Sequence, residues 1–244
     1  MTTKINKSSY SIVMSQLFDD VAFKFKRNIL KKEMDVPWMR YREIEMIEDL
    51  LKNIRPSNVL EWGAGSGTFY FTNHMPKDGK WLSVEHNKEW AASVAEKNDK
   101  SNVTIICKEP NNEPFPDAYY GLVDYKVNDG NYEDFKDYIE YPAEQKVLFD
   151  LILIDGRARV DCLNKSKELL SKNGVVMLHD ANRPQYHQAF DQYKNGILFS
   201  DQRNSSGGIW IGSNGDKALS EYLDIETYSK VWKLYDNIGR VIKV

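Results

Sequence analysis

The chain has 244 residues, with 33 basic and 36 acidic side chains and a net charge of −3. This length suits one large α/β domain with short additional segments. The nearly balanced charge predicts neither a nucleic acid nor an anionic membrane as a partner, and no apolar run approaches the ~20 residues that cross a bilayer.

The cysteines and the N-terminal residues favour a reducing, cytoplasmic environment. Cys107 and Cys162 lie far apart in the chain and lack the spacing of metal ligands. The first residues also lack the apolar segment of a secretory signal.

The first 56 residues predict an N-terminal helical segment. Apolar residues recur at helical spacing in residues 12–30 and again in residues 44–54. Pro37 interrupts the pattern between them, so we expect two helices.

Short apolar runs alternate with helical patterns from residue 57 onward. Strands are expected at residues 58–63, 80–86, 102–107, 149–155 and 174–180. Helices are expected at residues 68–75, 88–98, 160–172 and 185–194. This alternation indicates βαβ units with right-handed connections. The sequence therefore predicts an α/β fold with a doubly wound, mostly parallel, Rossmann-like sheet.

Two parts of the chain depart from this rhythm. Residues 108–146 are too long and polar for an ordinary connection, and we expect a partly ordered insertion near the rim of the site. Residues 196–202 and 207–213 predict an antiparallel hairpin, which brings the sheet to seven strands. This places the main domain at residues 57–213. The C-terminal extension, residues 214–244, predicts a further hairpin, with a helix as the alternative.

A glycine-rich turn follows the first predicted strand in the stretch VLEWGAGSG. Gly63, Gly65 and Gly67 allow a sharp turn and a close approach of backbone to a ligand. A phosphate-binding loop would need a lysine followed by serine or threonine, which this stretch lacks. A dinucleotide fingerprint would need glycine where Thr68 stands.

The pattern Glu-x-Gly-x-Gly-x-Gly resembles motif one of the class I S-adenosylmethionine-dependent methyltransferases. The resemblance covers roughly residues 57–190 and implies a transferase with S-adenosylmethionine as cofactor. Glu61 would serve the ammonium group of this cofactor. Glu85, at the end of the next predicted strand, would accept hydrogen bonds from both ribose hydroxyls. The predicted cofactor residues are Glu61, Gly63, Ala64, Gly65, Ser66, Gly67, Glu85 and Asp155.

A second group of polar residues follows two later strands. Asp155, His179 and Asp180 come at the carboxyl ends of strands, where ligands bind in open α/β sheets. Methyl transfer to a sugar hydroxyl needs a positioned acceptor and a base, a metal ion, or both. We expect His179 to be the base, with Asp155 and Asp180 orienting it or holding Mg²⁺ or Mn²⁺. The alternative is a core histidine beside a helix-capping aspartate.

The stretch LHDANRP is similar to the His-Asp-x-Asp-Arg segment of the glucuronoxylan O-methyltransferases. Asn182 stands where that pattern has aspartate, and Arg183 matches its arginine. The stretch IDGRARV looks like their Asp-Gly segment. The stretches VLEWGAGSG, LSVEH and IDGRAR together also look like a group of prokaryotic class I methyltransferases. In the metal-dependent catechol-type enzymes an Asp-Asn pair would place asparagine where this chain has Ala181.

Three arginines follow strand ends and are predicted to bind the acceptor. They are Arg157, Arg159 and Arg183. A planar guanidinium suits a carboxylate or a phosphate, which favours an acidic or phosphorylated sugar. The alternative is that these arginines cap helices or pair with neighbouring acids such as Asp161.

The sequence therefore predicts an S-adenosylmethionine-dependent O-methyltransferase that acts on a hydroxyl of a small polar metabolite, such as a saccharide. An aminopropyltransferase of the same fold, an NAD-binding oxidoreductase and a non-catalytic partner subunit are the alternatives. Residues 155–159 lack the Pro-Pro-aromatic pattern of enzymes that methylate nucleobases. The sequence does not decide whether the C-terminal extension, residues 214–244, builds a homo-oligomer.

Overall fold

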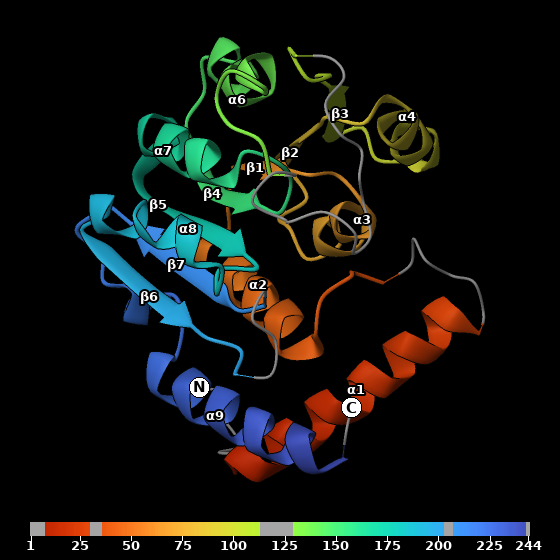
Figure 1. Cartoon of the computed structure of the whole chain (residues 1–244), viewed down its shortest axis with the longest axis vertical. Helices are drawn as coiled ribbons and strands as arrows, with labels where there is room; N and C mark the ends of the chain where they lie inside the picture. The colour runs from red at the N-terminus through yellow and green to blue at the C-terminus, as the bar shows by residue number, and fades with distance from the viewer. Residues whose placement is uncertain (1–7, 30–35, 113–128, 203–206, 243–244) are drawn as a thin grey trace.

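The computed structural model describes residues 8–29, 36–112, 129–202 and 207–242. One sheet runs through the molecule with helices around it (Figure 1). The strands are β1 (Asn58–Trp62), β2 (Lys80–Glu85), β3 (Val103–Cys107), β4 (Phe149–Ile154), β5 (Leu170–His179), β6 (Asn195–Phe199) and β7 (Ile209–Ser213). The α-helices are α1 (Ser9–Asn28), α2 (Tyr41–Ile54), α3 (Ser66–Thr72), α4 (Lys88–Lys97), α6 (Lys136–Glu144), α7 (Arg159–Leu169), α8 (Pro184–His187) and α9 (Ile225–Ile242). Short 3₁₀ helices are η2 (Phe190–Gln192) and η3 (Leu219–Glu221).

The strand order is β3-β2-β1-β4-β5-β7-β6. Strands β1 to β5 pair in parallel, while β7 runs antiparallel to both β5 and β6. This confirms the doubly wound, mostly parallel seven-stranded sheet expected from the sequence, including its antiparallel hairpin. Because β2, β1, β4 and β5 are consecutive neighbours, their carboxyl ends lie side by side at one edge of the sheet.

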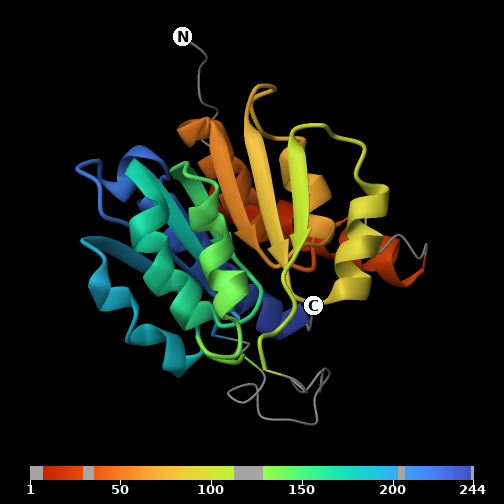
Figure 2. The ribbon, with the colours of Figure 1, turned by 90° about the horizontal axis from the view of Figure 1, so that it is seen from above.

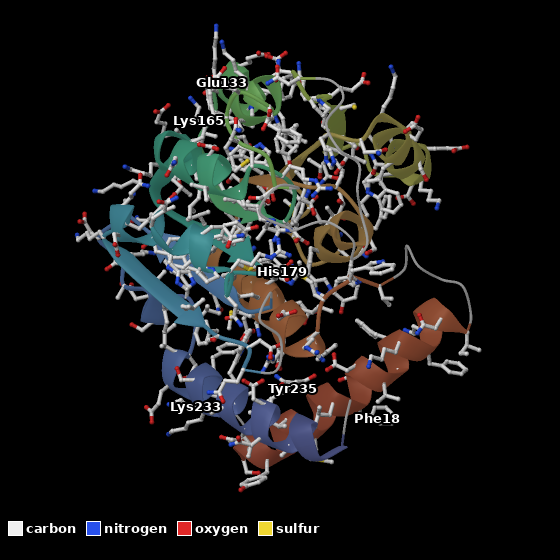
Figure 3. All side chains as sticks on the ribbon, viewed as in Figure 1. Phe18, Glu133, Lys165, His179, Lys233 and Tyr235 are labelled. Carbon is white, nitrogen blue, oxygen red and sulfur yellow. The ribbon has the colours of Figure 1, made fainter. Side chains whose placement is uncertain are left out.

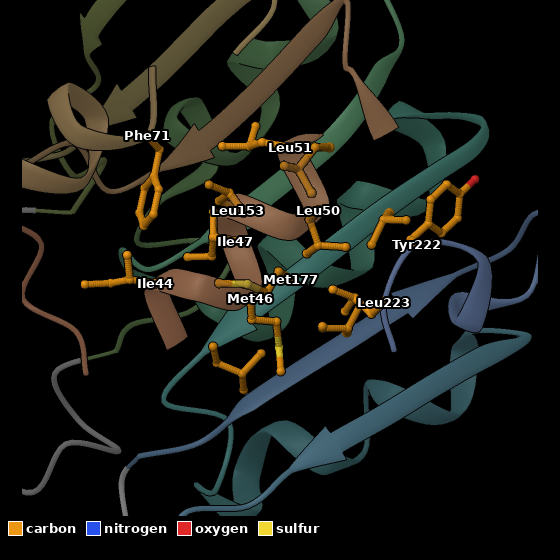
Figure 4. Packing of buried hydrophobic residues seen from close by; sticks show 14 of the residues in the cluster. Ile44, Met46, Ile47, Leu50, Leu51, Phe71, Leu153, Met177, Tyr222 and Leu223 are labelled. Atoms are coloured by element: carbon orange, nitrogen blue, oxygen red, sulfur yellow. The ribbon is translucent and has the colours of Figure 1, made fainter. Parts of the chain in front are cut away.

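Side chains of the strands alternate between two apolar cores. On one face, Leu153 of β4 and Met177 of β5 pack against α2 (Figure 4). On the other face, Ile152 and Leu178 pack with residues of α6 and α7. Figure 2 shows the helices on both sides of the sheet. Burial on both faces explains why these strands read as continuous apolar runs rather than as alternating patterns.

The predicted N-terminal helices both form, and they have different neighbours. Helix α2 belongs to the main core, where Ile47 and Leu50 are fully buried. Helix α1 places Phe23 in the same core but packs mainly on α9, and Figure 1 shows α1 and α9 side by side below the sheet. The domain boundaries after residues 56 and 213 stay predictions. Among the described helices, none combines the length and the apolar character that a bilayer crossing requires.

The tail is a helix, so the predicted C-terminal hairpin is wrong and its helical alternative is confirmed. The buried residues Tyr228, Val231, Trp232 and Tyr235 recur at helical spacing along α9. The guanidinium of Arg42 in α2 lies 4.0 Å from the ring centroid of Trp232 and 4.4 Å from that of Tyr235. This tertiary packing favours a helix, although the alternation of apolar and polar residues around 236–239 favours a hairpin.

The helix predicted over residues 185–194 is much shorter than expected. Helix α8 ends at His187, and the chain then turns through η2. The turn stacks the Phe190 ring on the Trp210 ring of β7, with centroids 4.6 Å apart. The chain therefore leaves the helix after His187 and places Phe190 over the indole of Trp210.

Part of the predicted insertion is a regular crossover helix. Helix α6 packs on the sheet through Tyr138 and Ile139. The backbone N–H of Asn111 donates a 2.8 Å hydrogen bond to the carbonyl oxygen of Asp134, which joins the start of the insertion to the residues just before α6. Residues 113–128, in its middle, lie outside the described residues.

Candidate functional site

The glycine-rich loop joins β1 to α3 at the carboxyl edge of the sheet. Gly63 has a φ of +101°, and a Cβ there would lie 2.8 Å from backbone atoms of Asp155 and Gly156. Glycine at this position is therefore required by the fold itself. Gly65 differs, because a Cβ there would meet only the Trp90 ring, at 3.7 Å. The fold leaves room at Gly65 that a side chain would fill and a ligand could use.

Glu61 lies beneath this loop with one carboxylate oxygen firmly held. Its Oε2 accepts hydrogen bonds from the Thr68 hydroxyl at 2.7 Å, from Trp81 Nε1 at 2.9 Å and from the Ser83 hydroxyl at 2.5 Å. Burial raises the pKa of Glu61 to about 7 despite these donors. A cationic group beside Glu61 would favour its ionised form.

Glu85 closes the loop from the end of β2. Its Oε2 accepts the backbone N–H of Ala64 at 3.0 Å, and its Oε1 accepts that of Asn87 at 2.9 Å. The Ala64 carbonyl accepts a 2.6 Å hydrogen bond from Trp90 Nε1. The structure thus brings Glu85 against the loop, as the sequence predicts.

Three of the predicted catalytic residues meet where β4 and β5 end. His179 Nδ1 lies 2.8 Å from Asp155 Oδ1 and 3.8 Å from Asp180 Oδ1. Figure 3 shows His179 beside α2. Asp180 has a φ of +58°, a left-handed conformation that is strained for a residue with a side chain. These three residues offer ligand atoms that all lie within 4.8 Å of one another.

The sequence interpretation missed Glu43, which reaches the same histidine from α2. Its Oε2 lies 3.5 Å from His179 Nε2 and accepts the backbone N–H of Arg40 at 2.9 Å. The imidazole therefore has a carboxylate at each ring nitrogen. In the sequence, a glutamate in the first turn of a helix indicates only a capping role. No local pattern links residue 43 to residue 179.

The surrounding charges fix the protonation of this cluster. Burial alone would lower the pKa of His179, but the neighbouring carboxylates, above all that of Asp155, hold it well above its ordinary value. Burial would likewise raise the pKa of Asp155, yet the His179 and Arg159 cations lower it. The carboxylates around the ring therefore favour its protonated form.

Arg159 is 7 % exposed and serves the cluster's own groups. Its Nη1 donates to the His179 carbonyl at 2.7 Å, and its Nη2 lies 3.2 Å from Asp155 Oδ1. Its Nη1 also lies 3.5 Å from Asp180 Oδ2. Asp129, from the predicted insertion, accepts the backbone N–H of Arg159 at 3.3 Å. These contacts indicate a positioning role, and a substrate role for Arg159 stays a prediction.

The other two predicted arginines point in different directions. Arg183 Nη2 donates to Asp180 Oδ2 at 2.6 Å, so it belongs to the acidic cluster. Arg157 Nε donates to His86 Nε2 at 3.4 Å, beside the end of β2. The arginines therefore do not form one shared surface, and their binding of an acceptor stays a prediction.

A cavity of about 260 Å³ opens beside His179. Its lining residues are Asp20, Lys24, Trp38, Met39, Arg40, Glu43, His179, Asp180, Asp201 and Gly207. They come from α1, from the start of α2 and from the ends of β5 and the β6–β7 connection. Neither the glycine-rich loop nor Glu85 contributes to the lining, so the cavity is distinct from the proposed cofactor cradle and meets the cluster at His179 and Asp180.

Comparisons with solved structures identify the fold. A methyltransferase-like protein from Silicibacter pomeroyi is 18 % identical, with a TM-score of 0.53, over 80 % of this chain and 97 % of that one. A putative caffeoyl-CoA O-methyltransferase from Staphylococcus aureus is 13 % identical, with a TM-score of 0.52, over 83 % and 97 % of the two chains. An O-methyltransferase from Bacillus cereus, solved in complex with SAH, is 13 % identical, with a TM-score of 0.51, over 86 % and 93 %.

The chain therefore has the fold of the class I S-adenosylmethionine-dependent methyltransferases, which confirms the fold expected from the sequence. The sequence itself matches no protein-family profile and no curated protein. No finding supports the aminopropyltransferase or the NAD-binding alternative.

Proposed function

We propose that this chain transfers a methyl group from S-adenosylmethionine to a hydroxyl of a small polar acceptor. The observation that carries the proposal is the His179 imidazole, which lies between the carboxylates of Asp155 and Glu43 at the carboxyl edge of a methyltransferase fold. Among the solved structures of this fold, the O-methyltransferase of Bacillus cereus has SAH bound.

The residues around the loop fit such a cofactor. Gly65 leaves a cradle that a Cβ would fill, and Glu61 offers a carboxylate beneath it. Glu85 carries a second carboxylate at the adjoining strand end, within reach of hydroxyl groups on a ligand in the loop. Ala64 and Ser66 complete the loop. S-adenosylmethionine supplies a methyl group on a cationic sulfonium, which is a good leaving group.

The chain must then hold the acceptor and remove its proton. A cation bound near the end of β4 would lower the pKa of His179, because it disfavours the imidazolium. Asp155 at Nδ1 and Glu43 at Nε2 fix the plane of the ring. His179 would then accept the hydroxyl proton as the acceptor oxygen attacks the methyl carbon in line.

The cavity beside His179 is the proposed acceptor site. Its lining combines the cations of Lys24 and Arg40 with the carboxylates of Asp20 and Asp201. Trp38 adds an aromatic ring that is 64 % exposed. Charges of both signs with an aromatic face suit a hydroxylated molecule such as a saccharide. A carboxylate or phosphate on that molecule would pair with Lys24.

A divalent metal is the second candidate for activating the acceptor. Asp155, His179 and Asp180 offer two carboxylates and an imidazole, a mixed set that favours Mn²⁺ over the strictly oxygen-seeking Mg²⁺. Arg159 and Arg183 compete with that role, because they already neutralise Asp155 and Asp180. Metal binding would require these guanidinium groups to move.

Methyl transfer from isotopically labelled cofactor to a panel of sugars and sugar acids tests the proposal. We expect incorporation with at least one acceptor, loss of turnover in His179→Ala, and retained affinity of that variant for S-adenosylhomocysteine. Adding a chelator separates the two modes of activation, because only a metal-dependent enzyme loses activity. Binding of NADH in place of S-adenosylhomocysteine would contradict the proposal.

A further inference from the structure

Helix α1 carries large apolar side chains on a face that no described segment covers. Their exposed fractions range from 52 % to 74 %. We call this set the outer stripe, and it consists of Tyr10, Met14, Phe18, Val21, Phe25 and Ile29. Figure 3 shows its central member, Phe18, on the side of α1 that points away from the sheet. Contiguous apolar surface of this kind on a folded protein marks an interaction site.

The opposite face of α1 is already fixed to the molecule. Val13 and Leu17 are buried against α9. Asp20 accepts the backbone N–H of Tyr41 at 2.7 Å and a hydrogen bond from the Tyr235 hydroxyl. Rotating α1 to bury the outer stripe would break these contacts. The stripe is therefore a second apolar face, which the described residues of this chain leave uncovered.

The area of the outer stripe matches one side of a stable protein interface. Phe and Tyr side chains present roughly 150–250 Å² each when fully exposed, and the Met, Val and Ile side chains of the stripe are smaller. At the observed exposed fractions, the stripe offers on the order of 700 Å². A standard interface buries about 800 Å² on each partner. The stripe of each copy would therefore supply most of the area that one partner buries in such an interface.

The spacing of the stripe reads the same in both chain directions. Its members are separated by 4, 4, 3, 4 and 4 positions. At about 100° per residue they lie within an arc of about 100°, which makes a straight, narrow seam. In an antiparallel pair of α1 helices, Phe18 would lie opposite Val21 of the partner. The flanking members would then match as well, Met14 with Phe25 and Tyr10 with Ile29.

We propose that α1 joins two copies of this chain into a homodimer through the outer stripe, with the two helices antiparallel about a two-fold axis. A two-fold contact uses the same patch on both subunits, so it requires a patch that is self-complementary on reversal. The charged residues of α1 have both signs: Asp19, Asp20, Lys24, Lys26 and Arg27. A membrane surface would instead select a uniformly basic border.

The mass in solution tests the dimer directly. Sedimentation of the full chain at tens of micromolar should give twice the 28.3 kDa of one chain. Phe18→Glu places two unpaired carboxylates at the centre of the seam and should raise the dissociation constant by about 100-fold or more. Leu148→Glu is the matched control, since Leu148 is 53 % exposed but lies outside α1. This control should remain dimeric.

Cysteine cross-linking tests the orientation. In a Cys107→Ser background, Met14→Cys and Phe25→Cys variants should each fail to cross-link alone. They should form a disulfide when mixed, because an antiparallel pair brings residue 14 of one copy to residue 25 of the other. Cys162 is buried and should not interfere.

Three results would overturn the proposal. The first is a wild-type chain that stays at the mass of one copy. The second is a dimer that Phe18→Glu and Val21→Glu both leave intact while circular dichroism shows native folding. The third is sedimentation with vesicles of phosphatidylcholine and phosphatidylserine that Phe18→Glu abolishes, which would assign the stripe to a lipid surface.

Discussion

Glu43 Oε2 lies 3.5 Å from Nε2 of His179, although 136 positions separate the two residues in the chain. The contact joins the first turn of α2 to the end of β5. It completes the carboxylate pair around the imidazole, so we expect Glu43 to set the protonation of the ring.

Glu43→Gln should lower the pKa of His179, because it removes a carboxylate at Nε2. NMR titration of the ring measures this, with Glu48→Gln on the same helix as the control. If deprotonated His179 is the base, the acidic limb of the turnover profile should move to lower pH. An unchanged ring titration would remove Glu43 from the proposed site.

The same substitution has a signed effect on stability. A raised histidine pKa stabilises the fold fully below the ordinary value of 6.5, and this contribution is lost as pH rises through the folded value. The free energy of unfolding of Glu43→Gln should therefore lie furthest below that of the wild type below pH 6.5, in the range where Glu43 is still ionised. The two curves should converge at alkaline pH in urea titrations.

Gly63→Ala and Gly65→Ala form a matched pair within one loop. Gly63→Ala forces a Cβ to 2.8 Å from the backbone of residues 155 and 156 at a φ of +101°, so it should destabilise the fold by more than about 1 kcal/mol. Gly65→Ala should leave the melting temperature nearly unchanged and weaken S-adenosylhomocysteine binding. Calorimetry that finds full affinity in folded Gly65→Ala would exclude a ligand from that cradle.

Glu61→Gln tests the buried carboxyl group under the loop. The pKa of Glu61 is raised from 4.5 to about 7, so the folded chain keeps a proton that the unfolded chain has lost in this range. Stability should therefore fall as pH rises from about 4.5 to 7, by at most about 3 kcal/mol. Chemical denaturation should show this slope in the wild type and not in Glu61→Gln. Equal slopes would mean that Glu61 ionises normally.

Arg159→Lys and Arg157→Lys separate positioning from acceptor binding. Lysine cannot reproduce the fork that holds the His179 carbonyl and Asp155, so Arg159→Lys should lower kcat about 10-fold or more with little change in acceptor KM. Arg157→Lys should change the acceptor KM instead if Arg157 binds the acceptor. A raised KM with normal kcat in Arg159→Lys would return Arg159 to the substrate-binding set.

Sequence patterns predicted the sheet and the residues at its carboxyl edge, because both depend on local order. Glu85 and His179 end strands, and parallel topology brings strand ends together. Glu43 and Asp20 could not be found this way, since helix-to-strand docking depends on tertiary packing. The hairpin predicted for residues 214–244 was wrong for the same reason, because Trp232 of α9 packs on Arg42 of α2.

Asp20 lines the cavity and accepts hydrogen bonds from the backbone of Tyr41 and from the hydroxyl of Tyr235, so α1, α2 and α9 meet at this residue. Helix α9 also places Tyr228 and Trp232 in the main core. We therefore expect removal of residues 225–244 to disturb the sheet's apolar packing and the acceptor cavity together, so that folding and acceptor recognition depend on the same helix.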